Sequence, residues 1–150
     1  VCVSLPTLDA ALSHRLEPTV APPRQRLRAV ARLAAAGIRV GVAIAPVLPR
    51  LTDDQATLDA VTRAAADAGA AFAWAGALNL GDVTRDAFFG FLDAQHPELV
   101  PLYREMYRAR YAPQRYAELI GARVDDAHRK ARFAPPPHIE PAPPPQLPLW

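Results

Sequence analysis

The chain has 150 residues, of which 51% are hydrophobic and 21% charged, and its formal net charge at pH 7 is +2. This composition is ordinary for a globular protein, and the length suits one domain better than two. The sequence lacks an apolar run of about 18 residues and a signal peptide, so we expect no membrane partner. Cys2 is the only cysteine, which excludes an internal disulfide and predicts a cytoplasmic location.

The basic residues are unevenly distributed along the chain. Residues 1–103 contain nine Arg against ten Asp and Glu, whereas residues 104–132 contain seven Arg and one Lys against four acidic residues. The second segment therefore carries a balance of +4. A basic patch of this size can meet phosphate and makes DNA a candidate partner, but it is much smaller than the basic stripe of a dedicated nucleic-acid-binding protein.

Three segments predict buried strands, and helices are predicted between them. The predicted strands are residues 1–4, 38–45 and 70–80, each rich in apolar residues. A helix over 22–36 begins at two prolines and stops at Gly37, and a helix over 53–68 follows Thr52 as its N-cap and stops at Gly69. Strands that alternate with helices in this way form right-handed units of a parallel sheet, and three of them make half of a parallel barrel.

The rest of the chain predicts helices and then a tail. Helices are expected over 84–95 and 98–111, and residues 112–132 are basic and partly helical. From Ala134 onward the sequence is rich in proline, which predicts a disordered or polyproline II tail. The predicted domains are thus the half-barrel (1–82), a helical extension (83–132) and the tail (133–150). Because the chain opens on Val1 directly in strand-like sequence, we expect it to be a piece of a longer protein.

Several short stretches together resemble one known family. They are Glu17-Pro18, Arg26-Leu27, Leu33-Ala34, Ala36-Gly37-Ile38, Val40-Gly41-Val42, Ala45-Pro46-Val47-Leu48-Pro49, Leu51-Thr52-Asp53 and the run HPELVPLYREMYRARYAPQRY (96–116). In this combination the chain is similar to the C-terminal half of radical SAM proteins, in the branch related to spore photoproduct lyase that is often labelled DNA repair photolyase. The resemblance covers about residues 1–120.

The resemblance implies a partial TIM-type barrel that holds S-adenosylmethionine and a [4Fe–4S] cluster, the cofactors of a lyase that acts in DNA repair. Carried over by position, Ser4 lies where polar residues at a strand end approach the ribose or the methionine part of the cofactor. The residues that flank the adenine would come from 45–49 and 78–82. By name these are Ala45, Pro46, Val47, Pro49, Leu78 and Asn79.

Three features of this chain depart from the family pattern. The three-cysteine loop C-x3-C-x2-C is absent, and one thiol does not hold a cluster that needs three or four. Arg50-Leu51-Thr52-Asp53 replaces the family's Gly-Leu-Asn-Asp, and Asn79-Leu80-Gly81-Asp82 replaces an arginine- and proline-containing turn. Two accounts stay open: a fragment whose partner is the missing N-terminal half of the barrel, or a degenerate, inactive member. Cys2 is expected to be a core residue, and the histidines show no metal-ligand spacing.

Two further patterns bear on binding partners. Tyr103, Tyr107 and Tyr111 recur every four residues, so they are expected on one helical stripe. The stripe either packs over the open end of the half-barrel or, with the neighbouring arginines, stacks on bases. Gln146-Leu147-Pro148-Leu149-Trp150 resembles the peptide with which bacterial repair and replication proteins hold the sliding clamp. In that resemblance Gln146, Leu147, Leu149 and Trp150 bind the clamp, and the alternative is a tail that packs on its own domain.

Overall fold

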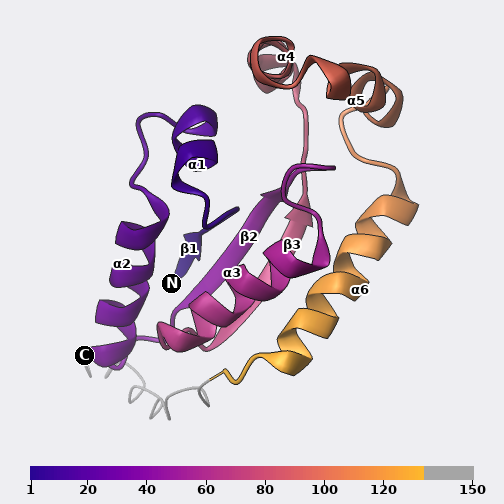
Figure 1. Ribbon diagram of the computed structural model, residues 1–150. Coiled ribbons are helices and arrows are strands. Elements are labelled where there is room, and N and C mark those ends of the chain that lie inside the picture. Colours follow the sequence, from indigo (N-terminus) through magenta and orange to yellow (C-terminus); the bar gives the residue numbers. More distant parts are fainter. Residues whose placement is uncertain (134–150) are drawn as a thin grey trace, which may run out of the picture.

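The computed structural model describes residues 1–133 and contains three parallel strands joined by helices (Figure 1). The strands are β1 (Cys2–Ser4), β2 (Gly41–Val47) and β3 (Phe72–Ala77), in the sheet order β1-β2-β3. The helices are α1 (Ala10–Leu16), α2 (Pro23–Ala35), α3 (Gln55–Asp67), α4 (Asp82–Gln95), α5 (Val100–Met106) and α6 (Gln114–Lys130), with a 3-10 turn η1 (Pro97–Leu99) before α5. The predicted α/β class and its parallel sheet are confirmed.

One face of the sheet carries the main hydrophobic core. Alternate strand residues, among them Val42 and Ile44 of β2, are fully buried against α2, α3 and α6. The helices contribute Val30, Leu58 and Ile120 to the same cluster. Since the side chains of a strand alternate between its two faces, this packing assigns Val3 of β1, Val42 and Ile44 of β2 and Ala73 and Ala75 of β3 to the helical side.

The opposite face of the sheet is made of small residues and two aromatic rings. Trp74 of β3 has 48% of its surface exposed, and the ring of Phe72 lies directly over Gly41, so that a Cβ atom at Gly41 would collide with it. Cys2 and Ser4 of β1 are exposed as well. The prediction that Cys2 is a core residue was therefore wrong, because the alternation of β1 turns only its middle residue, Val3, toward the helices.

A second hydrophobic cluster lies beyond the carboxyl ends of the strands, where α4 and α5 pack together. It contains Leu48, Leu80 and Leu92 around the stacked rings of Tyr103 and Tyr107, whose centroids are 5.8 Å apart. The single tyrosine stripe was wrong, because α5 ends at Met106 and Tyr107 is already its C-cap. Tyr103 and Tyr107 are buried whereas Tyr111 is 65% exposed, so only the first two pack over the strand ends.

The loop between β2 and α3 differs from the prediction at its capping residue. Asp54 rather than Thr52 caps α3, with its carboxylate accepting the backbone N–H of Thr57 at 2.9 Å. The buried Thr52 hydroxyl instead accepts the N–H of Leu48 at 2.9 Å. The chain thus makes a closed turn over 48–52 before the helix begins, which a capping preference read from sequence does not distinguish from a helix start.

Helix α1 was not predicted, and strand bounds moved by a few residues. Asp9 caps α1 by accepting the N–H groups of Ala11 and Leu12. Strand β2 begins later than the predicted 38–45 and continues to Val47, and β3 is shorter than the predicted 70–80. An apolar run signals a buried strand but does not fix where its hydrogen-bonded pairing begins and ends.

Within residues 1–133, no helix is both long and apolar enough to cross a lipid bilayer. The Gln146-Leu147-Pro148-Leu149-Trp150 peptide and the rest of the predicted tail from Ala134 lie outside the described residues.

Candidate functional site

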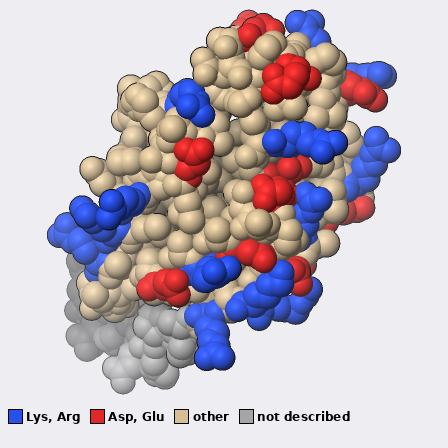
Figure 2. All heavy atoms as spheres, viewed as in Figure 1, with Lys and Arg blue, Asp and Glu red and all other residues tan. Residues whose placement is uncertain are grey.

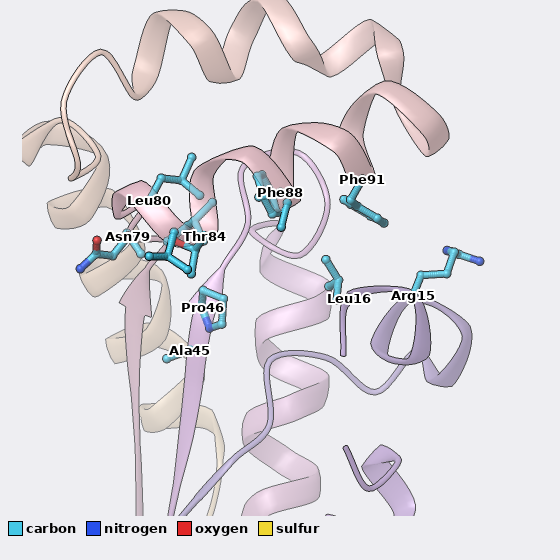
Figure 3. A pocket seen from close by; sticks show the side chains of 13 residues that line it. Arg15, Leu16, Ala45, Pro46, Asn79, Leu80, Thr84, Phe88 and Phe91 are labelled. Atoms are coloured by element: carbon cyan, nitrogen blue, oxygen red, sulfur yellow. The ribbon is translucent and has the colours of Figure 1, made fainter. Parts of the chain in front are cut away.

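A cavity of about 630 Å³ opens at the carboxyl ends of β2 and β3. Its floor comes from the strand ends, its roof from α4 and its outer rim from α1 (Figure 3). In parallel α/β folds this edge of the sheet is where ligands bind, because the loops that follow the strands converge there. The cavity is lined by Arg15, Leu16, Ala45, Pro46, Ala77, Leu78, Asn79, Leu80, Val83, Thr84, Ala87, Phe88 and Phe91.

The floor of the cavity is fixed by hydrogen bonds between neighbouring strands. The Ser4 hydroxyl donates to the carbonyl of Ala45 at 3.1 Å, and the Leu78 N–H donates to the carbonyl of Val47 at 3.1 Å. Between Ile44 and Val47 the pairing of β2 with β3 shifts register. The end of β2 is therefore held on both sides, by β1 and by the segment after β3, while Ala45 and Pro46 remain partly exposed toward the cavity.

The roof of the cavity is apolar. Phe88 and Phe91 lie one helical turn apart on α4 and their rings contact each other, with centroids 5.9 Å apart. Figure 3 shows both rings above the space that separates Pro46 from Leu16. The cavity thus offers aromatic side chains from α4 and aliphatic side chains from the strand ends and Leu16. These surfaces suit a flat heterocycle, because such a ring loses little hydration free energy when it leaves water and gains contacts with them.

Asn79 supplies an oriented amide at the rim of the cavity. Its Oδ1 atom accepts the Arg110 Nε–H at 2.9 Å, and its backbone pairs with Tyr111 in an isolated antiparallel bridge. The Leu80 N–H donates to the carbonyl of Arg110 at 2.8 Å. Since the Asn79 carbonyl oxygen is already bonded, its NH2 group is the end that is left to donate to a ligand.

A shallower hollow of about 500 Å³ adjoins this rim at the start of α4. It is lined by Asn79, Gly81, Asp82, Val83, Thr84 and Arg110. Gly81 has no side chain to cap the helix, and the Thr84 hydroxyl donates back to the Gly81 carbonyl at 3.0 Å. The hollow therefore combines an exposed guanidinium with the carboxylate of Asp82, so its charges are mixed.

A polar network ties the β2–α3 loop to the C-terminal helices α5 and α6. The Tyr103 hydroxyl donates to the carbonyl of Pro49 at 2.8 Å, and the Tyr116 hydroxyl donates to Asp53 Oδ2 at 3.1 Å. The Arg123 guanidinium lies 3.9 Å from the same carboxylate oxygen. Burial, reinforced by the Asp53 charge, raises the pKa of Tyr116 well above its usual range. These bonds make the network a structural support for the loop.

The structure brings together four of the seven residues that the family resemblance places around the cofactor. Ala45, Pro46, Leu78 and Asn79 line the cavity. Ser4 does not line the cavity, but its hydroxyl donates to the carbonyl of Ala45, which does. Val47 and Pro49 do not line it: the Val47 side chain is in the main core, and Pro49 is buried with its carbonyl facing Tyr103.

Other lining residues escaped the sequence analysis. Arg15 and Leu16 belong to α1, which was not predicted, although Asp9 before an apolar pair was a usable capping signal. Phe88 and Phe91 were not among the predicted site residues. Their spacing of three was the signal that both lie on one face of α4.

Residues 1–133 contain no group of three or more His, Cys, Asp or Glu side chains placed to hold a metal ion. Cys2, the only cysteine of the sequence, is exposed on the uncovered face of the sheet. The residues of this chain therefore do not fit a [4Fe–4S] cluster, which needs three or four thiolates.

The chain is similar to curated proteins from mycobacteria. Uncharacterized protein Rv2578c of Mycobacterium tuberculosis and uncharacterized protein Mb2609c of Mycobacterium bovis are each 39% identical to it over 135 residues, which is 89% of this chain and 40% of the relative. The chain thus spans less than half the length of these relatives. No protein-family model and no solved structure matches it.

Proposed function

We propose that this chain forms the C-terminal strands of a radical SAM barrel and that the cavity at its strand ends binds the adenine of S-adenosylmethionine. The observation that carries the proposal is the position of Ala45, Pro46, Leu78 and Asn79. The resemblance to the spore photoproduct lyase-like branch places them beside the adenine, and all four line one cavity at the expected edge of a parallel sheet.

The sheet itself supports membership of a larger barrel. Within residues 1–133 helices cover one face of the sheet, the other face carries small residues and the rings of Phe72 and Trp74, and β1 is an edge strand in the order β1-β2-β3. Further parallel strands paired with β1 would curve this sheet toward closure and would cover Trp74 and Ser4. The additional length of the mycobacterial relatives is where such strands would be encoded.

The chain's own residues would bind and orient the cofactor. Pro46 and Leu78 would contact one side of the adenine and Phe88 the other, while the Asn79 NH2 group would donate to a ring nitrogen. In such an enzyme the cofactor supplies a carbon radical when its sulfonium bond is cleaved by an electron. The cluster that delivers this electron, the lyase activity and a DNA substrate would all depend on residues outside this chain.

Binding of the cofactor by the purified chain tests the proposal. Titration calorimetry with S-adenosylmethionine and S-adenosylhomocysteine should give saturable binding with Kd of about 1 mM or tighter, equivalent to about 4 kcal/mol. Ala87→Trp fills the cavity from an exposed position of α4 and should abolish binding. Asp93→Trp, at an exposed position on the opposite face of α4, is the matched control. Absence of binding by the unmodified chain, or equal loss in both variants, would refute the assignment.

A second proposed role rests on sequence alone and belongs to another functional class. In it the domain is catalytically silent and is tethered to the bacterial sliding clamp through Gln146-Leu147-Pro148-Leu149-Trp150. The feature that favours it is the pattern of an amide, two leucines and a terminal aromatic ring, which suits a polar rim around an apolar groove.

A further inference from the structure

A second groove lies between α5 and α6. It measures about 650 Å³ and is separate from the proposed cofactor cavity, with which it shares no residue. Its lining comes from the last turn of α5, the connecting segment and the first turns of α6. The residues are Leu102, Glu105, Met106, Arg108, Pro113, Arg115, Tyr116 and Leu119.

The floor of the groove is apolar and firmly anchored. Met106 packs against both hydrophobic clusters, and Tyr116 is bonded through its hydroxyl to Asp53. Leu119, at the edge, leaves 44% of its surface exposed. An exposed leucine beside a preformed apolar hollow is the arrangement that receives an apolar side chain from another segment.

The rim of the groove carries two arginines and one acidic residue, so its formal balance is positive. Residues 104–116 contain four arginines and one acidic residue, Glu105. In residues 1–133 none of the four forms an ion pair. Arg104 stacks over Phe89 and Arg110 bonds Asn79, which leaves Arg108 and Arg115 at the groove itself. Figure 2 shows basic side chains over the side formed by α5 and α6, with acidic ones among them.

We propose that this groove binds an amphipathic helical segment of a partner protein, with its apolar side chains on Met106 and Leu119 and its carboxylates facing Arg108 and Arg115. Charge complementarity selects an acidic occupant. A peptide with an apolar face fits better than nucleic acid, because a phosphate backbone would leave the apolar floor of the groove in water. The proposal is independent of cofactor binding at the strand ends.

Synthetic peptides of about 16 residues, long enough to form a helix in water, provide the probes. One carries Leu along one face and Glu elsewhere; the second has Lys in place of Glu; the third has the composition of the first in an order that lacks an apolar face. A labelled DNA duplex completes the set. Met106 is the only methionine of the sequence, so a 13C-methyl label, in protein released from a cleavable tag, reports directly from the groove.

The acidic amphipathic peptide should bind about tenfold or more tightly than the other two peptides and should shift the Met106 methyl signal. Leu119→Glu, and separately Arg108→Glu with Arg115→Glu, should each weaken it about tenfold or more. Leu8→Glu and Arg28→Glu replace exposed residues elsewhere and should change nothing. All variants are checked for folding by circular dichroism.

Three outcomes would overturn the proposal. These are equal binding of the acidic and the lysine peptide, failure of the acidic peptide to bind, and tighter binding of the DNA duplex with loss in the arginine variant but not in Leu119→Glu. The last result would assign the surface to nucleic acid.

Discussion

The Arg26 guanidinium lies 2.6 Å from a carboxylate oxygen of Glu17 and joins three segments of the chain. Arg26 is 6% exposed, donates to the carbonyl of Ala21 at 2.6 Å and donates to the carbonyl of Ser4 at 3.1 Å. Ser4 in turn donates to Ala45 at the cavity floor. Arg26 is therefore a positioning residue, which holds the end of β1 against the end of β2.

Glu17→Gln should lower the free energy of unfolding by about 1–2 kcal/mol. A buried arginine that loses its counter-charge keeps its desolvation cost, but Glu17 is 36% exposed, so the effect stays below that of a fully buried pair. Urea unfolding measures it, and Glu105→Gln, at an exposed position without an ion pair in the described residues, is the control. Equal stability of the two variants would show that the pair does not hold β1 in place.

Tyr103 and Tyr107 form a matched pair for testing buried hydroxyls. The Tyr103 hydroxyl bonds the Pro49 carbonyl, whereas the buried Tyr107 hydroxyl has no partner in residues 1–133. Tyr103→Phe should cost about 1–2 kcal/mol because the carbonyl is left unsatisfied, while Tyr107→Phe should be neutral or stabilising. Thermal and urea unfolding of both variants decide it, and a Tyr107→Phe protein as unstable as Tyr103→Phe would indicate a bonding partner for Tyr107.

High pH should unfold the protein through its buried tyrosines. Burial raises the pKa of Tyr103, Tyr107 and Tyr116, with further contributions from the Asp53 charge. Because the folded pKa lies above the unfolded value of about 10, the stabilisation is complete below pH ~10 and is lost as the pH rises above it. Absorbance at the tyrosinate band should rise for these residues only as circular dichroism is lost. Their ionisation in a protein that keeps its native spectrum would contradict the burial seen here.

The isolated chain should not assemble an iron–sulfur cluster. With one exposed thiol, anaerobic reconstitution should leave iron and sulfide far below four of each per chain, and Cys2→Ser should give the same result. Iron and sulfide assays with absorption spectroscopy measure this. A stoichiometric four-iron cluster would overturn the proposal that the cluster ligands lie elsewhere.

The peptide at 146–150 can be tested apart from the domain. If it binds the sliding clamp, replacing Leu149 and Trp150 by Ala should remove about 3 kcal/mol or more, over a hundredfold in Kd, because aromatic and apolar anchors dominate small interfaces. Calorimetry against purified clamp measures the loss, and the melting temperature of the same variant should not change. A lower melting temperature would instead mean that the peptide packs on its own domain.

The sequence by itself determined the α/β class, the parallel strands and most helices. Apolar runs, prolines at helix starts and glycines after helix ends are local signals, and Gly37 and Gly69 indeed have φ angles of +74° and +85°. For the same reason α2 was predicted almost to the residue. Ala45, Pro46, Leu78 and Asn79 came from the family resemblance and not from any local pattern.

Only the tertiary structure decided which residues meet. Asp54 and Thr52 are both good caps, and the closing of the 48–52 turn selects Asp54. Tyr103 and Tyr107 are buried because α4 packs over the strand ends, and Arg15 reaches the cavity rim through α1, a helix of only seven residues. Contacts between residues distant in sequence depend on packing and loop geometry, which a single sequence does not encode in any short window.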